Sequence, residues 1–99
     1  MEKRKLLAAR AYCLLFCNIT LTVSADKQRE ESLLLQVRND GGEIHFAFVD
    51  LSTGETKTFD NPSTGEYAVS LKRSSKVKLL ITANRAIGSY RIEKRTSVD

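Results

Sequence analysis

Few side chains in this chain of 99 residues have the chemistry of a catalytic centre, and their spacing does not bring them together. His45 is the only histidine. A nucleophilic triad would need His45 to meet a distant serine and an acid such as Asp50 or Asp60. No serine stands in a sequence that marks it as an activated nucleophile. His45 alternates with Ile44 and Phe46, so it lies opposite the apolar row of an expected strand. We therefore expect an exposed histidine and no enzymatic activity.

Acidic side chains are the next candidates, because oxygen ligands gathered by turns can bind Ca²⁺. The carboxylates in or beside expected turns are Asp40, Glu43, Asp50, Glu55, Asp60 and Glu66. The segment 50–54 comes nearest to a calcium loop, but it lacks three alternating oxygen ligands, and Gly54 is one position early. Cys13 and Cys17 would suit one helix face, but two thiols without a neighbouring histidine or carboxylate make a poor metal site. We expect no metal and no other cofactor.

The first 25 residues have the pattern of a secretory signal peptide. Four basic residues precede an apolar stretch over 11–23, and Val23-Ser24-Ala25 has the small residues of a cleavage site. We expect 1–25 to form a signal-peptide helix that is cut between Ala25 and Asp26, and the protein to be secreted or held at the cell envelope. The alternative is an uncleaved membrane anchor over 11–25, although a spanning helix needs about 20 apolar residues.

Cleavage would change the charge and the cysteine content of the working protein. The whole chain has 16 basic and 12 acidic residues, a net charge of +4. Residues 26–99 have 12 and 11, a net charge of +1, and no cysteine. Small exported eukaryotic domains usually carry disulfides. The composition therefore favours a bacterial protein that is stabilised by packing.

Residues 33–99 are predicted to fold as a small antiparallel β-sandwich, after a flexible charged spacer over 26–32. Apolar residues recur with a period of two, and turn signals separate the runs at intervals typical of sandwiches. The fold class is all-β. The six expected strands are Leu33–Arg38, Glu43–Asp50, Thr56–Asp60, Glu66–Lys72, Lys76–Ala83 and Ile87–Lys94.

Three C-terminal segments carry a family resemblance: Gly-Glu-Tyr-Ala-Val-Ser-Leu-Lys at 65–72, Lys-Val-Lys-Leu-Leu-Ile-Thr-Ala at 76–83 and Gly-Ser-Tyr-Arg-Ile at 88–92. Their rhythm resembles the closing strands of small exported bacterial β-sandwiches, namely pre-peptidase C-terminal-type and related cell-surface domains. The resemblance implies a β-sandwich in an extracytoplasmic setting. It identifies no functional residue.

Charge is divided unevenly along the expected domain. Residues 26–69 have 4 basic and 9 acidic groups, whereas residues 70–99 have 8 basic and 2 acidic groups. The basic stretch could dock an anionic polymer or lipid headgroups. Alternatively, cross-strand ion pairs could cancel the asymmetry. The candidate contacts with an anionic surface are Lys72, Arg73, Lys76, Lys78, Arg91, Lys94 and Arg95.

These features favour a non-catalytic, exported β-sandwich that binds at the bacterial cell envelope, through a protein partner or an anionic polymer. The alternative is a small secreted inhibitor or accessory protein that acts on one protein target through the loop 61–66. Tyr90 is the only aromatic residue in the basic stretch, which argues against stacking on nucleic acid. Membrane contact is expected only if the N-terminal segment is retained. The sequence does not indicate an oligomeric state.

Overall fold

The computed structural model describes residues 2–10, 17–39, 41, 43–84 and 89–97. These residues form eight β-strands and no helix. The strands are β1 (Glu2–Arg10), β2 (Cys17–Ser24), β3 (Glu31–Arg38), β4 (Glu43–Asp50), β5 (Thr56–Asp60), β6 (Gly65–Leu71), β7 (Lys76–Asn84) and β8 (Ser89–Ser97). The expected all-β class is confirmed.

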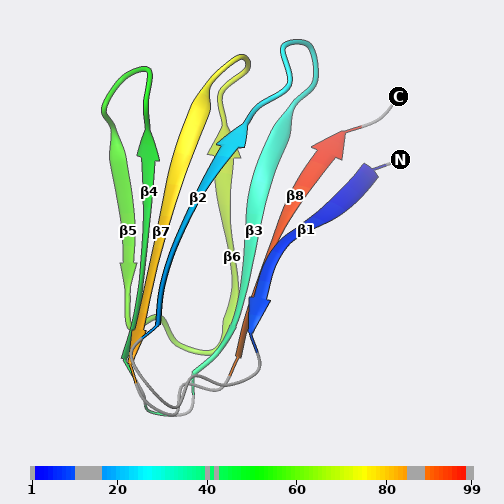
Figure 1. Cartoon of the computed structure of the whole chain (residues 1–99). Helices are drawn as coiled ribbons and strands as arrows, with labels where there is room; N and C mark the ends of the chain where they lie inside the picture. Colours follow the sequence, from blue (N-terminus) through cyan, green and yellow to red (C-terminus); the bar gives the residue numbers. More distant parts are fainter. Residues whose placement is uncertain (1, 11–16, 40, 42, 85–88, 98–99) are drawn as a thin grey trace.

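The strands form two antiparallel sheets of four strands each (Figure 1). One sheet has the order β1-β8-β3-β6, and the other has the order β2-β7-β4-β5. Apart from β4 and β5, consecutive strands lie in different sheets. Eight strands connected in this way have the arrangement of a double-sheet jelly roll. The β-sandwich architecture expected from the sequence is therefore present, with eight strands rather than six.

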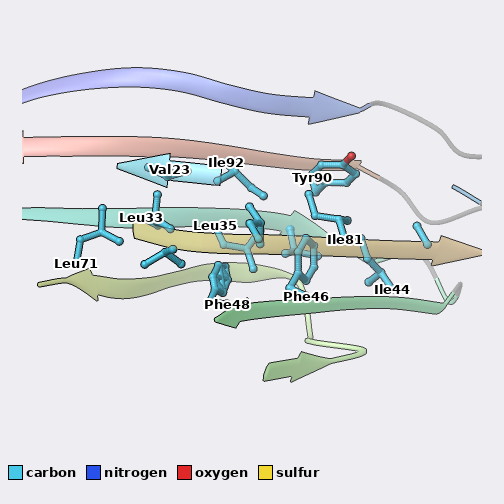
Figure 2. Packing of buried hydrophobic residues seen from close by; sticks show 14 residues of the cluster. Val23, Leu33, Leu35, Ile44, Phe46, Phe48, Leu71, Ile81, Tyr90 and Ile92 are labelled. Carbon is cyan, nitrogen blue, oxygen red and sulfur yellow. The ribbon is translucent and has the colours of Figure 1, made fainter. Parts of the chain in front are cut away.

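The core lies between the two sheets and is built by the alternation seen in the sequence. Figure 2 shows Leu35, Phe46, Phe48 and Ile92 pointing into the space between the strands, and all four are buried. The Phe46 and Tyr90 rings meet edge to face, with centroids 5.8 Å apart. This contact joins the two sheets, because β4 and β8 belong to different ones. Such aromatic pairs add stability beyond the area they bury.

The N-terminal segment differs most from the expectation. A signal-peptide helix is wrong for residues 2–10 and 17–24, which are strands at the edges of the two sheets. β1 pairs with β8, and β2 pairs with β7 from Cys17↔Ala83 to Ser24↔Lys76. Val23 is only 6% exposed.

Local sequence explains why β2 can be a strand. Its residues alternate between apolar and polar types and include β-branched Ile19, Thr20, Thr22 and Val23, which fit a pleated, half-buried surface. β1 has less of this character, but it completes the hydrogen bonding of β8 at the edge of the sheet. Residues 11–16, which carried much of the apolar signal, lie outside the described residues. In the described part of the chain, no helix is long and apolar enough to cross a membrane. Cleavage between Ala25 and Asp26 stays a prediction.

The segment expected as a spacer over 26–32 contains the start of β3. Glu31 and Ser32 are buried, and Glu31 pairs with Leu71 of β6 and Thr96 of β8. Residues 26–30 connect the two sheets in a turn, in which the Asp26 carboxylate accepts hydrogen bonds from the backbone N–H groups of Gln28 and Arg29. The connection is therefore short and internally bonded.

A candidate anion site beside β1 and β8

The seven basic residues predicted to contact an anionic surface are divided among a turn and two strands of different sheets. Lys72 and Arg73 lie in the turn between β6 and β7, while Lys76 and Lys78 lie on β7. Arg91, Lys94 and Arg95 lie on β8, in the other sheet. Neighbours in the C-terminal sequence are thus divided between two sheets.

Several of these residues also have acidic partners. The ion pairs are Lys72–Glu55 at 3.2 Å, Arg73–Glu30 at 4.0 Å, Arg91–Glu93 at 3.5 Å and Lys94–Glu31 at 3.4 Å. The first two are exposed pairs, which contribute about 0–1 kcal/mol to stability. They nevertheless neutralise the local charge. Of the four pairs, Lys94–Glu31 joins two strands, β8 and β3, as in the cross-strand alternative that the sequence leaves open.

β1 restores a concentration of positive charge at the edge of one sheet. In the register with β8, Arg4 lies opposite Arg95 and Lys5 lies opposite Lys94. The strands run antiparallel, so the ends of β1 and β8 lie side by side (Figure 1). Sequence reasoning missed the contribution of β1, because Lys3, Arg4 and Lys5 had been assigned to a removable signal. The one sequence feature that could have indicated this contribution is the run of three consecutive basic residues, Lys3, Arg4 and Lys5.

These residues border a hollow of about 420 Å³, called here the basic hollow. It is lined by Lys3, Arg4, Lys5, Asp26, Arg29, Glu31, Lys94 and Thr96. Five of the lining residues are basic and two are acidic, a net charge of +3. Two larger hollows are closer to balance: one is lined by Arg38, Arg91 and Glu66 among its charged residues, and the other by Lys57, Lys72, Asp50 and Glu55. The basic hollow therefore has the strongest charge bias of the three.

Glu31 is a buried residue of the lining of the basic hollow, and hydrogen bonds hold its side chain in place. Its side chain is 3% exposed. Its carboxylate accepts hydrogen bonds from the Asp26 backbone N–H at 2.6 Å and from the Thr96 hydroxyl at 2.5 Å. Lys94 Nζ lies 3.4 Å from the same carboxylate and also donates to the Ser24 carbonyl at 3.3 Å. Lys94 thus joins β8 both to the start of β3 and to the end of β2.

Both acids of the basic hollow are held in the charged state. Burial alone would raise the pKa of Glu31, but hydrogen bonds from Thr96 and Asp26 and the charge of Lys94 outweigh it, so this pKa lies below its usual value. Backbone hydrogen bonds from Gln28 and Arg29 lower the pKa of Asp26. Both carboxylates are committed to internal contacts. Lys94 is committed as well, whereas the exposed Lys3 and Lys5 are among the cations that remain for a ligand.

His45 and the turn carboxylates have no comparable surroundings. His45 lies on β4, and its Nδ1 is 2.9 Å from the Asp60 carboxylate on β5, with both side chains open to solvent. No serine of the described segments bonds to His45. Within those segments, no three His, Cys, Asp or Glu side chains are grouped so that they could hold a metal ion. Asp50 is used instead to fix its own turn, where its carboxylate accepts from the N–H groups of Ser52 and Thr53.

The loop after β5, which the sequence offered as a second contact site, is tied to its surroundings. Asn61 has a φ of 48°, and its side-chain oxygen accepts a hydrogen bond from the Ile44 N–H at 2.9 Å. The Asn39 amide donates to the Pro62 carbonyl at 3.1 Å, and the Tyr67 hydroxyl donates to the Ser63 carbonyl at 2.7 Å. The loop is therefore ordered in advance of any contact.

Comparisons with known proteins do not assign a family. No family model matches the chain, and no curated protein matches it. A solved structure from Bacillus endospore appendages, described as a novel family of disulfide-linked pili, aligns with a TM-score of 0.41 and 14% identity over 96% of this chain and 99% of that chain. The P-domain of Macrobrachium rosenbergii nodavirus aligns with a TM-score of 0.37 and 8% identity over 95% and 90% of the two chains. Similarity at this level identifies no function.

Proposed function

We propose that this protein is a non-catalytic β-sandwich of the bacterial cell envelope that binds an anionic polymer through the basic hollow. One observation carries the proposal: Lys5 lies opposite Lys94 at the edge of the sheet, and Lys3 lies on the same face of β1, so three lysines line the basic hollow. Like charges directly opposite each other on antiparallel strands destabilise the pair. A polyanion bound in the basic hollow, beside Lys5 and Lys94, would offset this repulsion.

Two lysines that line the basic hollow, Lys3 and Lys5, support the same proposal. In the described part of the chain, Lys3 and Lys5 make no ion pair, and both are exposed. Lysine ammonium groups bind phosphate as point charges without a fixed geometry, which suits a repeating polymer better than a single shaped ligand.

The proposal requires that the working protein keeps residues 1–25. β1 and β2 give each sheet its fourth strand, so their loss would leave β7 and β8 as open edges. It would also remove Lys3, Arg4 and Lys5 from the basic hollow. The intact mass of the protein recovered from cells tests this requirement directly. A mass that corresponds to residues 26–99 would contradict the proposal.

Retention on isolated bacterial cell walls tests the binding itself. Because the contact is electrostatic, retention should weaken steeply as salt rises from about 0.1 M to about 1 M, where the screening length falls from roughly 10 Å to 3 Å. The Lys3→Glu/Lys5→Glu variant should lose retention at low salt. The matched control is Lys76→Glu/Lys78→Glu, which changes the net charge equally but lies on β7 of the other sheet. Equal losses in both variants, or retention that ignores salt, would refute the basic hollow as the site.

A second candidate function is supported by the ordered loop over 61–64. A loop that is fixed before contact loses little conformational entropy on binding, as an inhibitor or accessory protein that acts on one protein target would need. A stoichiometric protein partner recovered with the full chain, and retained by the Lys3→Glu/Lys5→Glu variant, would favour this candidate.

A further inference from the structure

Each sheet of the sandwich ends in two edge strands, and three of the four carry protection against pairing with another chain. Unpaired backbone groups at an edge are a template for a further strand, and charges, proline, bulges and short length are the usual protections. β1 has three consecutive basic residues and a register shift between Leu6 and Ala8. β5 has only five residues and includes Lys57. β6 begins with Gly65 and Glu66.

β2 lacks all of these protections. It has eight residues, none of which is charged, glycine or proline. It follows β7 without a register shift along its whole length. It lies last in the order β2-β7-β4-β5, so no strand among the described residues covers its outer edge. An edge of this kind is the most available for strand addition.

We propose that β2 pairs antiparallel with β2 of a second copy of this chain, about a two-fold axis, so that two four-stranded sheets become one of eight strands. The neutrality of β2 is the reason for choosing a second copy. In a two-fold contact each strand meets itself reversed, so charges of one sign on the strand would repel those of the second copy. β2 has none to repel.

The alternation of β2 supports the same partner and indicates a register. With Leu21 opposite Leu21 of the second copy, Thr20 lies opposite Thr22, Ile19 opposite Val23, and Asn18 opposite Ser24. Ile19, Leu21 and Val23 pack toward the core, whereas Asn18, Thr20, Thr22 and Ser24 are exposed. Apolar residues therefore meet apolar ones on one face, and polar residues meet polar ones on the other. Facing threonines are a favourable cross-strand pair.

The inference goes beyond the proposed binding of an anionic polymer and shares with it only the retention of residues 1–25. The basic hollow is lined by β1, β8, the turn after β2 and the start of β3, whereas the contact uses the outer edge of β2. The two can therefore fail separately: variants of Lys3 and Lys5 test the first, and variants of Thr20 and Thr22 test the second.

The mass of the full chain in solution, measured by sedimentation, tests the inference. The mass measured for the wild-type protein should be twice the 11.1 kDa of one chain. Thr20→Lys/Thr22→Lys places like charges opposite each other across the axis and should halve the observed mass. Thr20→Lys/Thr22→Glu places opposite charges there and should restore it. The matched control is Thr56→Lys/Thr58→Lys, with the same substitutions on the other edge of the same sheet, and it should leave the dimer intact.

Two results would overturn the inference: a wild-type chain that is monomeric at all concentrations, or a folded Thr20→Lys/Thr22→Lys variant that stays dimeric. If that variant does not fold, hydrogen exchange of the wild-type chain decides. Backbone amides of β2 should be more protected at high than at low protein concentration. Protection of β2 that does not change with concentration would count against the contact.

Discussion

Glu31 offers the sharpest test of how the two sheets are joined near the basic hollow. Glu31→Ala removes a carboxylate that is 3% exposed and that accepts hydrogen bonds from the Asp26 N–H and the Thr96 hydroxyl. It also removes the ionic partner of Lys94. All three groups converge on one side chain, so the substitution should weaken the connection between β2, β3 and β8 at once.

The size of the effect follows from the groups left behind. A hydrogen bond to a charged group contributes about 1.5–3 kcal/mol, and both bonds to the Glu31 carboxylate are part-buried, which places them near the lower end. The Asp26 N–H and the Thr96 hydroxyl are both affected, whereas Lys94 keeps the Ser24 carbonyl and is 22% exposed, so water reaches it. We expect Glu31→Ala to lower the free energy of unfolding by about 2–4 kcal/mol. Glu31→Gln retains an acceptor oxygen and should cost about half as much.

The effect of Glu31→Ala on the free energy of unfolding should also depend on pH. The pKa of Glu31 is lowered in the folded state relative to its ordinary value of 4.5. A lowered carboxyl pKa contributes stability that is present above the unfolded pKa and is lost as pH falls through the folded pKa. The difference in stability between wild type and Glu31→Ala should therefore be largest near neutral pH and should shrink below pH 4.5.

Urea unfolding is followed by circular dichroism near neutral pH and again at about pH 3. It measures the loss of stability and its dependence on pH. The midpoint should shift at unchanged slope, which separates a change in stability from a change in the unfolded state. Equal midpoints for wild type and Glu31→Ala at neutral pH would refute the assignment of Glu31 as a structural anchor. A difference that stays the same at acid pH would refute the role of its charge.

Three further predictions concern the core, the ordered loop and the N-terminal strands. Phe46→Ala removes a fully buried ring that meets Tyr90 and should cost about 3–5 kcal/mol in urea unfolding; a loss below 1 kcal/mol would contradict this packing. Asn61→Ala should destabilise more than Asn61→Gly by about 1 kcal/mol, because glycine tolerates the φ of 48° and alanine does not; equal unfolding midpoints would exclude strain there. A chain that begins at Asp26 lacks both N-terminal edge strands and should melt at least about 10 °C below the full chain, the shift that a loss of 2–3 kcal/mol produces in a domain of this size. Equal melting temperatures would show that these strands are dispensable.

The sequence alone determined the elements whose signals are local. Alternation predicts strands with one buried apolar face, and the residues of these faces are buried in β3 and β4, namely Leu33, Leu35, Val37, Ile44, Phe46 and Phe48. Leu34, on the other face of β3, is buried as well, which alternation did not predict. The outward side of His45 follows from the same period. Gly54, with a φ of 79°, takes the left-handed position expected for its loop. Such features depend on neighbours within a few residues, so a single sequence contains them.

Tertiary structure decided that the N-terminal segment forms strands, and it decided which side chains lie near the basic residues. A cationic start followed by apolar and β-branched residues is compatible with a signal and with edge strands. Only pairing with β7 and β8, far along the chain, makes residues 2–10 and 17–24 strands. The same pairing sets Lys5 against Lys94, while the turn between β6 and β7 brings Lys72 within reach of Glu55. A charge acts on what lies near it in space, and in an antiparallel sandwich those neighbours are decided by strand order and register.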